Sequence, residues 1–130
     1  MIEIRKKDLL YPELSYKIIG ILFGVFNALG YGHKEKYYEN ALAVAFDASG
    51  LKYQKQVYAE LHFRDVVVGK YFFDFLIENL IVLELKQGNY FSQKNIEQVS
   101  SYLQTRQLRL GIIAQFTSKG VRYKRIVNEF

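Results

Sequence analysis

The chain has 130 residues, half of them hydrophobic, and this length and composition predict one folded domain over residues 1–130. It has no cysteine, which excludes a disulfide framework, thiol catalysis and cysteine-ligated zinc, and its two histidines disfavour a histidine-rich metal site. Its net charge of +5 suits a polyanionic partner. No apolar run approaches the roughly 20 residues that span a bilayer, and the N-terminal residues lack a signal-peptide core. We therefore expect a cytoplasmic protein with no membrane partner.

The first helix is expected after a short lead over residues 1–11. Pro12 suits the first turn of a helix, because its missing N–H would have no intrahelical partner there. Apolar residues then recur at helical spacing until Gly30 stops the run. We expect this amphipathic helix to pack on a sheet. A membrane-surface helix is disfavoured by Gly20, Gly24 and the few cations on the polar face.

A second helix is expected from about Lys34 to Ser49. Glu35 lies in its first turn and shares one face with Tyr38 and Leu42. The helix macrodipole alone can explain a glutamate in a first turn. On the apolar side of the helix, however, a carboxylate needs a partner.

The first strand is predicted over residues 52–63, with a turn at Arg64-Asp65. Residues 66–69 are either a short strand of their own or the start of the next one. In the second case the chain bends at Gly69 before it enters the most apolar part of the sequence.

Residues 71–86, YFFDFLIENLIVLELK, predict a β-hairpin, because two runs rich in Phe, Ile, Leu and Val flank Glu78-Asn79. With a three-residue loop, one face is wholly apolar and carries the pairs Phe73–Leu85, Phe75–Leu83 and Ile77–Ile81. A two-residue loop would place charged and apolar side chains on both faces. Because side chains alternate along a strand, burial favours the first register.

The other face of this hairpin then carries Asp74 directly opposite Glu84, with Lys86 two residues further along. Two carboxylates roughly 5 Å apart across strands repel by about 3 kcal/mol at an effective dielectric constant of about 20. Lys86 or a divalent metal with oxygen ligands would relieve this repulsion. Glu-x-Lys is also common on exposed strands, so the pattern alone leaves a purely structural role open.

The rest of the chain predicts one more helix and two strands. Ser92 suits the N-cap of a third helix that reaches about residue 105. Gln98 and Tyr102 stand four residues apart and therefore share a face of that helix. Residues 108–116 predict a buried strand, and residues 121–127 a basic edge strand. The expected order is helix, helix, three strands, helix, strand, strand.

Several motifs in this order resemble the GxxExxY proteins. Residues 32–38, GHKEKYY, fit the pattern that names that family, and LIVLELK, NIEQVSSYL and LRLGIIAQF are similar to its later segments. The resemblance runs from about Tyr11 to Val127. That family is placed among the PD-(D/E)XK, or restriction-endonuclease-like, nucleases, and Gln98-x-x-x-Tyr102 suggests the RecB-like branch. Phe73 stands where the superfamily name has Pro, a frequent departure.

The resemblance implies an α/β fold with a mixed sheet flanked by helices. The core order is αβββαβ, here with an extra N-terminal helix. It implies that Asp74, Glu84 and Glu35 bind a metal, Mg²⁺ or alternatively Mn²⁺. Lys86 would be the catalytic lysine, and the site would be completed by two residues that contact the phosphate or support the others, Gln98 and Tyr102.

The implied activity is metal-dependent hydrolysis of phosphodiester bonds in nucleic acid, DNA rather than RNA, in repair, recombination or defence. Cations that would contact phosphates are Lys34, Lys36, Lys94, Arg122 and Lys124. Tyr90 and Phe91 are candidates for stacking on a base. Two alternatives stay open: a catalytically silent nucleic-acid-binding module of the same fold, and a Holliday-junction-resolvase-like homodimer.

Overall fold

The computed structural model describes residues 10–88 and 90–128, so most of the predicted lead at residues 1–11 lies outside the described residues. The elements are α1 (Pro12–Leu29), α2 (Glu35–Ala48), β1 (Tyr53–Phe63), β2 (Val66–Ile77), β3 (Ile81–Gln87), α3 (Gln93–Arg106), β4 (Leu110–Thr117) and β5 (Gly120–Val127). The predicted order is confirmed. Residues 66–69 belong to the continuous strand β2, so the second of the two alternatives for this segment is correct.

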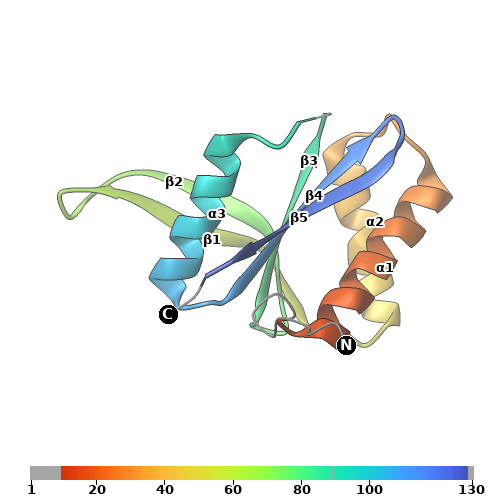
Figure 1. Cartoon of the computed structure of the whole chain (residues 1–130), viewed down its shortest axis with the longest axis horizontal. Helices are drawn as coiled ribbons and strands as arrows, with labels where there is room; N and C mark the ends of the chain where they lie inside the picture. Colours follow the sequence, from red (N-terminus) through yellow and green to blue (C-terminus); the bar gives the residue numbers. More distant parts are fainter. Residues whose placement is uncertain (1–9, 89, 129–130) are drawn as a thin grey trace, which may run out of the picture.

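The five strands form one mixed sheet in the order β1-β2-β3-β4-β5 (Figure 1). Neighbouring strands are antiparallel except β3 and β4, which are parallel. A parallel pair needs a crossover, and α3 provides it between β3 and β4. This topology places β3 in the middle of the sheet, where the predicted Glu84 and Lys86 lie.

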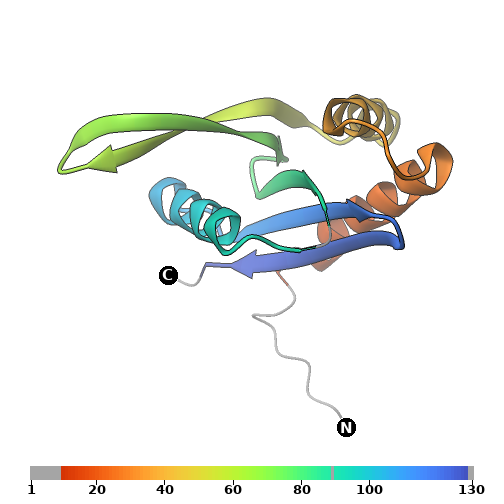
Figure 2. The same cartoon turned by 90° about the horizontal axis from the view of Figure 1, so that it is seen from above.

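The helices cover both faces of the sheet (Figure 2). On one face α1 and α2 pack against residues that include Phe75, Leu83 and Phe116. On the other face α3 packs against residues that include Leu76, Val82 and Ile113. No helix in the described part of the chain is long and apolar enough to cross a membrane.

The contact between α3 and β4 is close at Gly111. A Cβ atom at this position would lie 2.6 Å from Cγ1 of Val99, which is closer than real Cβ contacts. We therefore expect Gly111→Ala to lower the free energy of unfolding by roughly 1–3 kcal/mol, measured by urea denaturation. Adding Val99→Ala should recover part of this loss. In contrast, Gly20→Ala meets nothing within 4 Å in α1 and should stabilise the chain by roughly 0.5–1 kcal/mol.

The predicted register of the β2–β3 hairpin is confirmed. Phe75 pairs with Leu83 and Ile77 with Ile81, which leaves a three-residue loop. Within this loop Glu78 and Asn79 both have positive φ. The Glu78 carboxylate accepts a hydrogen bond from the backbone N–H of Lys52 at 2.6 Å, which attaches the loop to the start of β1.

Phe73 does not lie where the sequence predicts it. It belongs to the cluster under α3, whereas Phe75 packs under α1 and α2. The cause is a local irregularity: Gln56, opposite Asp74, has a left-handed φ of 51°, and no pair joins these two residues in the otherwise continuous β1–β2 ladder. The prediction that Phe73 and Phe75 share one apolar face is therefore wrong.

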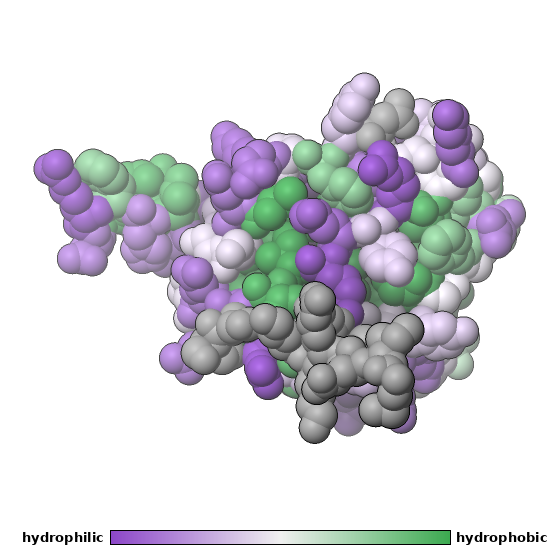
Figure 3. Space-filling view, in the orientation of Figure 1, coloured by the Kyte–Doolittle hydropathy of each residue, from purple (hydrophilic) through white to green (hydrophobic). Residues whose placement is uncertain are grey.

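Beyond this irregularity β1 and β2 form a two-stranded arm, residues 57–73, that projects from the sheet (Figures 1 and 2). The arm carries exposed hydrophobic side chains, part of which are visible at the left of Figure 3: Tyr58, Leu61, Phe63, Val66, Val67, Val68 and Phe72. An isolated two-stranded ribbon is only marginally stable in water. Among residues 10–88 and 90–128, α3 covers the base of the arm and packs against Val57, Ala59 and Phe73.

Candidate active site

Asp74 and Glu84 lie where the β2–β3 ladder ends. The backbone pairing stops at Phe75–Leu83, and the two carboxylates accept the hydrogen bonds that the next pair would otherwise need. The N–H of Leu85 donates to Oδ2 of Asp74 at 2.7 Å, and the N–H of Asp74 donates to Oε1 of Glu84 at 3.2 Å. Each carboxylate is thus fixed by a backbone N–H of the neighbouring strand.

Glu84 belongs to the face of the sheet that α3 covers, because Val82 packs under α3 and side chains two residues apart on a regular strand point to the same face. Asp74 lies at the irregularity opposite Gln56, and its hydrogen bonds with β3 place it beside Glu84. Lys86, two residues after Glu84, places its Nζ 3.8 Å from Oε2 of Glu84. The structure thus brings together the three charged residues that the sequence singled out in the hairpin.

The electrostatics of Glu84 are unusual for a carboxylate. It is 8% exposed, and its pKa is raised from 4.5 to about 9, first by burial and then by the hydrogen bond and negative charge of Asp74. The ammonium group of Lys86 lowers the pKa but does not offset these two effects. A buried carboxylate beside another carboxylate favours either a proton or a cation between them.

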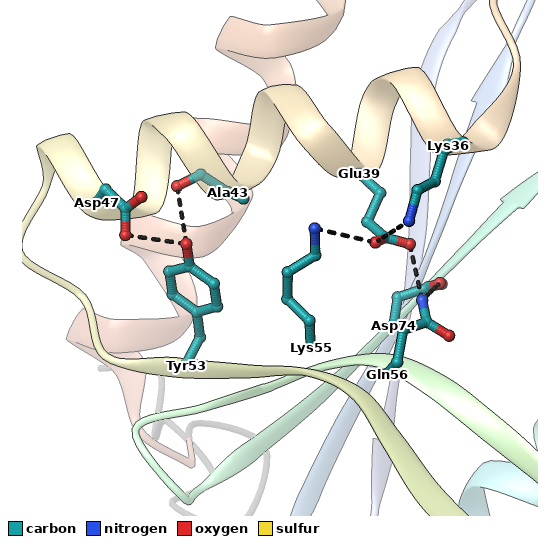
Figure 4. A network of polar contacts seen from close by, with 8 residues as sticks. All are labelled: Lys36, Glu39, Ala43, Asp47, Tyr53, Lys55, Gln56 and Asp74. Atoms are coloured by element: carbon teal, nitrogen blue, oxygen red, sulfur yellow. Dashed lines mark hydrogen bonds and ion pairs between the residues drawn. The ribbon is translucent and has the colours of Figure 1, made fainter.

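Sequence analysis missed one charged residue near this pair, Glu39 on α2. It is 4% exposed, and its carboxylate accepts a hydrogen bond from Nε2 of Gln56 at 2.8 Å. The same Nε2 lies 3.4 Å from Oδ1 of Asp74, so Gln56 connects the two carboxylates (Figure 4). Lys36 and Lys55 each approach Glu39 to 3.3 Å and balance its charge. The sequence did carry one signal for Glu39: it stands four residues, about one helical turn, after Glu35 and therefore shares a face of α2 with it.

Glu35, the first residue of α2, lies beside the C-terminal end of β3, away from the hairpin loop. Its Oε2 accepts a hydrogen bond from the N–H of Gln87 at 2.9 Å, so it holds the residue directly after Lys86. The side-chain amide of Gln87 in turn donates to the carbonyl of His33. Among residues 10–88 and 90–128, no three Asp, Glu or His side chains gather closely enough to hold a metal. The expected three-carboxylate set with Glu35 is therefore not assembled in this structure.

Gln98 and Tyr102 both lie on α3. Gln98 is half-buried. The hydroxyl of Tyr102 accepts a hydrogen bond from Nη1 of Arg106 at 3.2 Å, and its ring packs 4.8 Å from that of Phe73, the residue before Asp74. Tyr102 thus contacts β2 at Phe73, next to Asp74, and its hydroxyl bonds to Arg106 rather than to Asp74 or Glu84.

Gln115 on β4 is a second residue that sequence analysis missed. It is 1% exposed, and it stands opposite Lys86 in the β3–β4 register. Its amide donates to the carbonyl of Tyr90 in the loop before α3. Its buried Oε1 has no hydrogen-bond partner among the described residues. Buried polar atoms are nearly always paired, so this oxygen marks a polar position beside Lys86.

Most of the cations expected to contact phosphates lie at the surface. Lys34 lies over the ring of Tyr37 at 6.0 Å, and Lys36 pairs with Glu39. The guanidinium of Arg122 lies 5.5 Å from the ring centroid of Phe91, a ring that packs beside the cluster under α3. Phe91 is thus partly packed on its own fold, whereas Tyr90 is 86% exposed.

The donor set of the Asp74–Glu84 pair fits a divalent cation with oxygen ligands. Mg²⁺ is commonly held by one or two carboxylates and completes its octahedron with waters and substrate phosphates. The raised pKa of Glu84 shows that the pair holds two negative charges only at a cost. A divalent cation would remove that cost by neutralising both carboxylates.

Comparisons with known proteins identify the superfamily and the fold of the chain. The family model of the PD-(D/E)XK nuclease superfamily matches residues 12–126. The chain is also similar to a solved structure described as "Crystal structure of SSO0001", with 15% sequence identity and a TM-score of 0.52, over 73% of this chain and 50% of that one. It thus spans about half the length of that protein. No curated protein matches the chain. The expected restriction-endonuclease-like fold is confirmed.

Proposed function

Because the chain belongs to the PD-(D/E)XK nuclease superfamily, we propose that it is a metal-dependent nuclease that hydrolyses phosphodiester bonds at Asp74, Glu84 and Lys86. The observation that supports this most directly is the pair of carboxylates at the end of the β2–β3 ladder, fixed by backbone N–H groups with a lysine 3.8 Å away. A site of this kind is preorganised, because its charges are held in place before substrate binds.

In this proposal Asp74 and Glu84 would hold the metal. When bound, Mg²⁺ or Mn²⁺ supplies Lewis-acid polarisation of the phosphoryl oxygens and lowers the pKa of a nearby water. The side-chain amide of Gln56 bonds to both Glu39 and Asp74. In this way Glu39 and Gln56 would fix the orientation of the Asp74 carboxylate. Glu35 holds the backbone of Gln87 and thereby fixes the position of Lys86.

Lys86 would bind the phosphate and stabilise the charge that develops on it. Its side chain is 33% exposed, so the ammonium group reaches solvent while it remains close to Glu84. Gln98 would orient the attacking water, because an amide both donates and accepts hydrogen bonds. Gln115 ties the loop at Tyr90 to β4 directly beside Lys86 and keeps this end of the site in place.

The finer classification follows the sequence motifs. We place the chain among the GxxExxY proteins, in the RecB-like branch, because Glu35 and Tyr38 in α2 and Gln98 and Tyr102 in α3 match those patterns. DNA is the proposed substrate, in repair, recombination or defence. The net charge of +5 supports a polyanionic substrate.

The test is cleavage of labelled single-stranded, duplex and branched DNA, and of RNA, in Mg²⁺, Mn²⁺ or EDTA. We expect cleavage that needs metal and that falls by about a hundredfold or more in Lys86→Ala. Lys17→Ala is the matched control, because Lys17 lies on α1 and its ammonium group bonds to the carbonyl of Ser49. Equal cleavage by all three proteins would exclude this site. Salt-sensitive binding without cleavage would favour the silent nucleic-acid-binding module.

A further inference from the structure

A cavity of about 330 Å³ opens between the arm and α3. The arm contributes Tyr58, Glu60, His62 and Tyr71 to its lining, and α3 contributes Tyr102 and Arg106. The site described above does not use this cavity, although Tyr102 belongs to both regions. Its volume is at the lower end of the roughly 300–1,000 Å³ typical of ligand sites, so it suits one small, compact group.

The walls of this cavity are aromatic. The ring of Tyr58 lies 5.6 Å from that of Phe72 across the arm, and Tyr71 packs edge-on against Phe73 at 5.3 Å. Phe73 also contacts Tyr102, at 4.8 Å. Tyr71, Phe73 and Tyr102 thus connect the cavity to the residue next to Asp74, whereas Tyr58 and Phe72 form a separate aromatic pair. A ligand in the cavity would therefore be a near neighbour of the carboxylate pair.

The rim of the cavity carries hydrogen-bonding groups. The exposed Arg106 places its guanidinium 5.5 Å from the centroid of the Tyr102 ring and donates to the Tyr102 hydroxyl. Glu60 accepts from the hydroxyl of Tyr58 at 2.8 Å and lies 3.0 Å from Nε2 of His62. Burial raises the pKa of Tyr71 and of Tyr102 above 10.0, so both hydroxyls keep their protons at neutral pH.

We propose that this cavity receives an unpaired nucleobase of the substrate, adjacent to the phosphate that the carboxylate pair cleaves. The proposal rests on the nuclease function proposed above and narrows its substrate to nucleic acid with a single-stranded segment at the cut. A flat base stacks on tyrosine rings, whereas Arg106 at the rim is placed to pair with the phosphate of the same nucleotide. A paired base has both of its faces covered inside a duplex and does not enter such a cavity.

The proposal can be tested by binding in EDTA, where cleavage does not interfere. The probe is a 12-nucleotide DNA strand with one central 2-aminopurine, used alone and annealed to its complement. The chain has no tryptophan, so the fluorescence of the probe can be excited separately from that of the protein. We expect quenching on binding of the single strand and tighter binding of the single strand than of the duplex.

Tyr58→Ala should weaken single-strand binding by about tenfold and abolish most of the quenching, because one stacking surface is lost. Tyr123→Ala is the matched control: Tyr123 is 43% exposed on β5 and Tyr58 is 44% exposed, so both substitutions remove a similar exposed ring. Ser101→Leu, on an exposed lining residue of α3, fills the cavity without removing a ring and should have the same effect as Tyr58→Ala.

Equal affinities of the two tyrosine variants, or a duplex bound as tightly as the single strand, would overturn the proposal. The proposal would also be overturned if the wild-type protein formed a dimer in solution, measured by its native molecular mass, and Tyr58→Ala abolished that dimer. The arm would then bind a second copy of the chain. Cleavage in Mg²⁺ by the same proteins separates the two proposals. If the wild-type protein cleaves but Tyr58→Ala binds the single strand as Tyr123→Ala does, the base site alone is refuted. If the probe is quenched on binding but no protein cleaves, the nuclease function alone is refuted.

Discussion

Asp74→Asn is expected to lower metal-dependent cleavage by about a thousandfold and to leave the chain folded. Asparagine keeps one oxygen that can accept the hydrogen bond from the N–H of Leu85, so the end of the β2–β3 hairpin retains its geometry. The substitution removes the negative charge that makes this position a metal ligand in our proposal. Cleavage rates at saturating Mg²⁺ and the affinity for Mn²⁺, measured by calorimetry, should fall together.

The matched control for this substitution is Asp65→Asn. Asp65 lies in the turn at the tip of the arm with φ of 64°, a conformation that asparagine tolerates well, and it is exposed. Both variants lose one negative charge from the same pair of strands, but only Asp74 lies beside Glu84. If Asp74→Asn and Asp65→Asn cleave equally well, the carboxylate pair is not the catalytic site.

The hairpin register could be predicted from sequence because burial selects it. With Phe75, Ile77, Ile81 and Leu83 on adjoining strands, only one register buries all four side chains together. The same argument brings Asp74 beside Glu84, whose carboxylate accepts a hydrogen bond from the Asp74 N–H, but it fails at Phe73, beyond the last pair of the ladder. Helix ends were predictable for a similar reason, since Pro12, Gly30 and Ser92 act on the backbone locally.

The contribution of Glu39 could not be predicted, because it depends on the backbone at Gln56. A left-handed residue inside a strand is not encoded by alternation, and glutamine has no special preference for positive φ. At this residue the β1–β2 ladder is interrupted, Phe73 of β2 lies on the α3 side, and the Gln56 amide lies between Glu39 and Asp74. A side chain's partners on another element follow from such twists, which periodicity does not report.

The cavity beside the arm escaped prediction for the same reason. Tyr58, Tyr71 and Tyr102 come from three elements, and in the sequence each one is simply an aromatic residue in a strand or helix. Only the close packing of α3 on the base of the arm brings them together. The sequence indicated the chemistry of the carboxylate pair, whereas the shape of its surroundings depends on tertiary packing.

The second large effect is expected for Glu84→Gln, which should stabilise the metal-free protein. The pKa of Glu84 is raised to about 9 in the folded state by burial and by Asp74, so the folded state binds a proton that the unfolded state releases above about pH 4.5. The stability that this proton provides is fully present below pH 4.5 and is lost as the pH rises toward 9. The neutral amide of glutamine removes that loss.

Urea denaturation in EDTA between pH 5 and 9 measures this effect. The free energy of unfolding of the wild-type chain should fall with rising pH, whereas Glu84→Gln should be flatter and more stable at pH 8 by roughly 1–2 kcal/mol. Mg²⁺ should stabilise the wild-type chain at pH 8 but not the variant, because a bound cation replaces the proton between the carboxylates only when both are charged. If the free energy of unfolding of the wild-type chain does not change with pH in EDTA, Glu84 is already ionised at neutral pH. Repulsion between the two carboxylates would then be too weak to favour a bound cation. Gain of stability together with loss of metal binding in one variant would instead show that this carboxylate is kept for function at the expense of the fold.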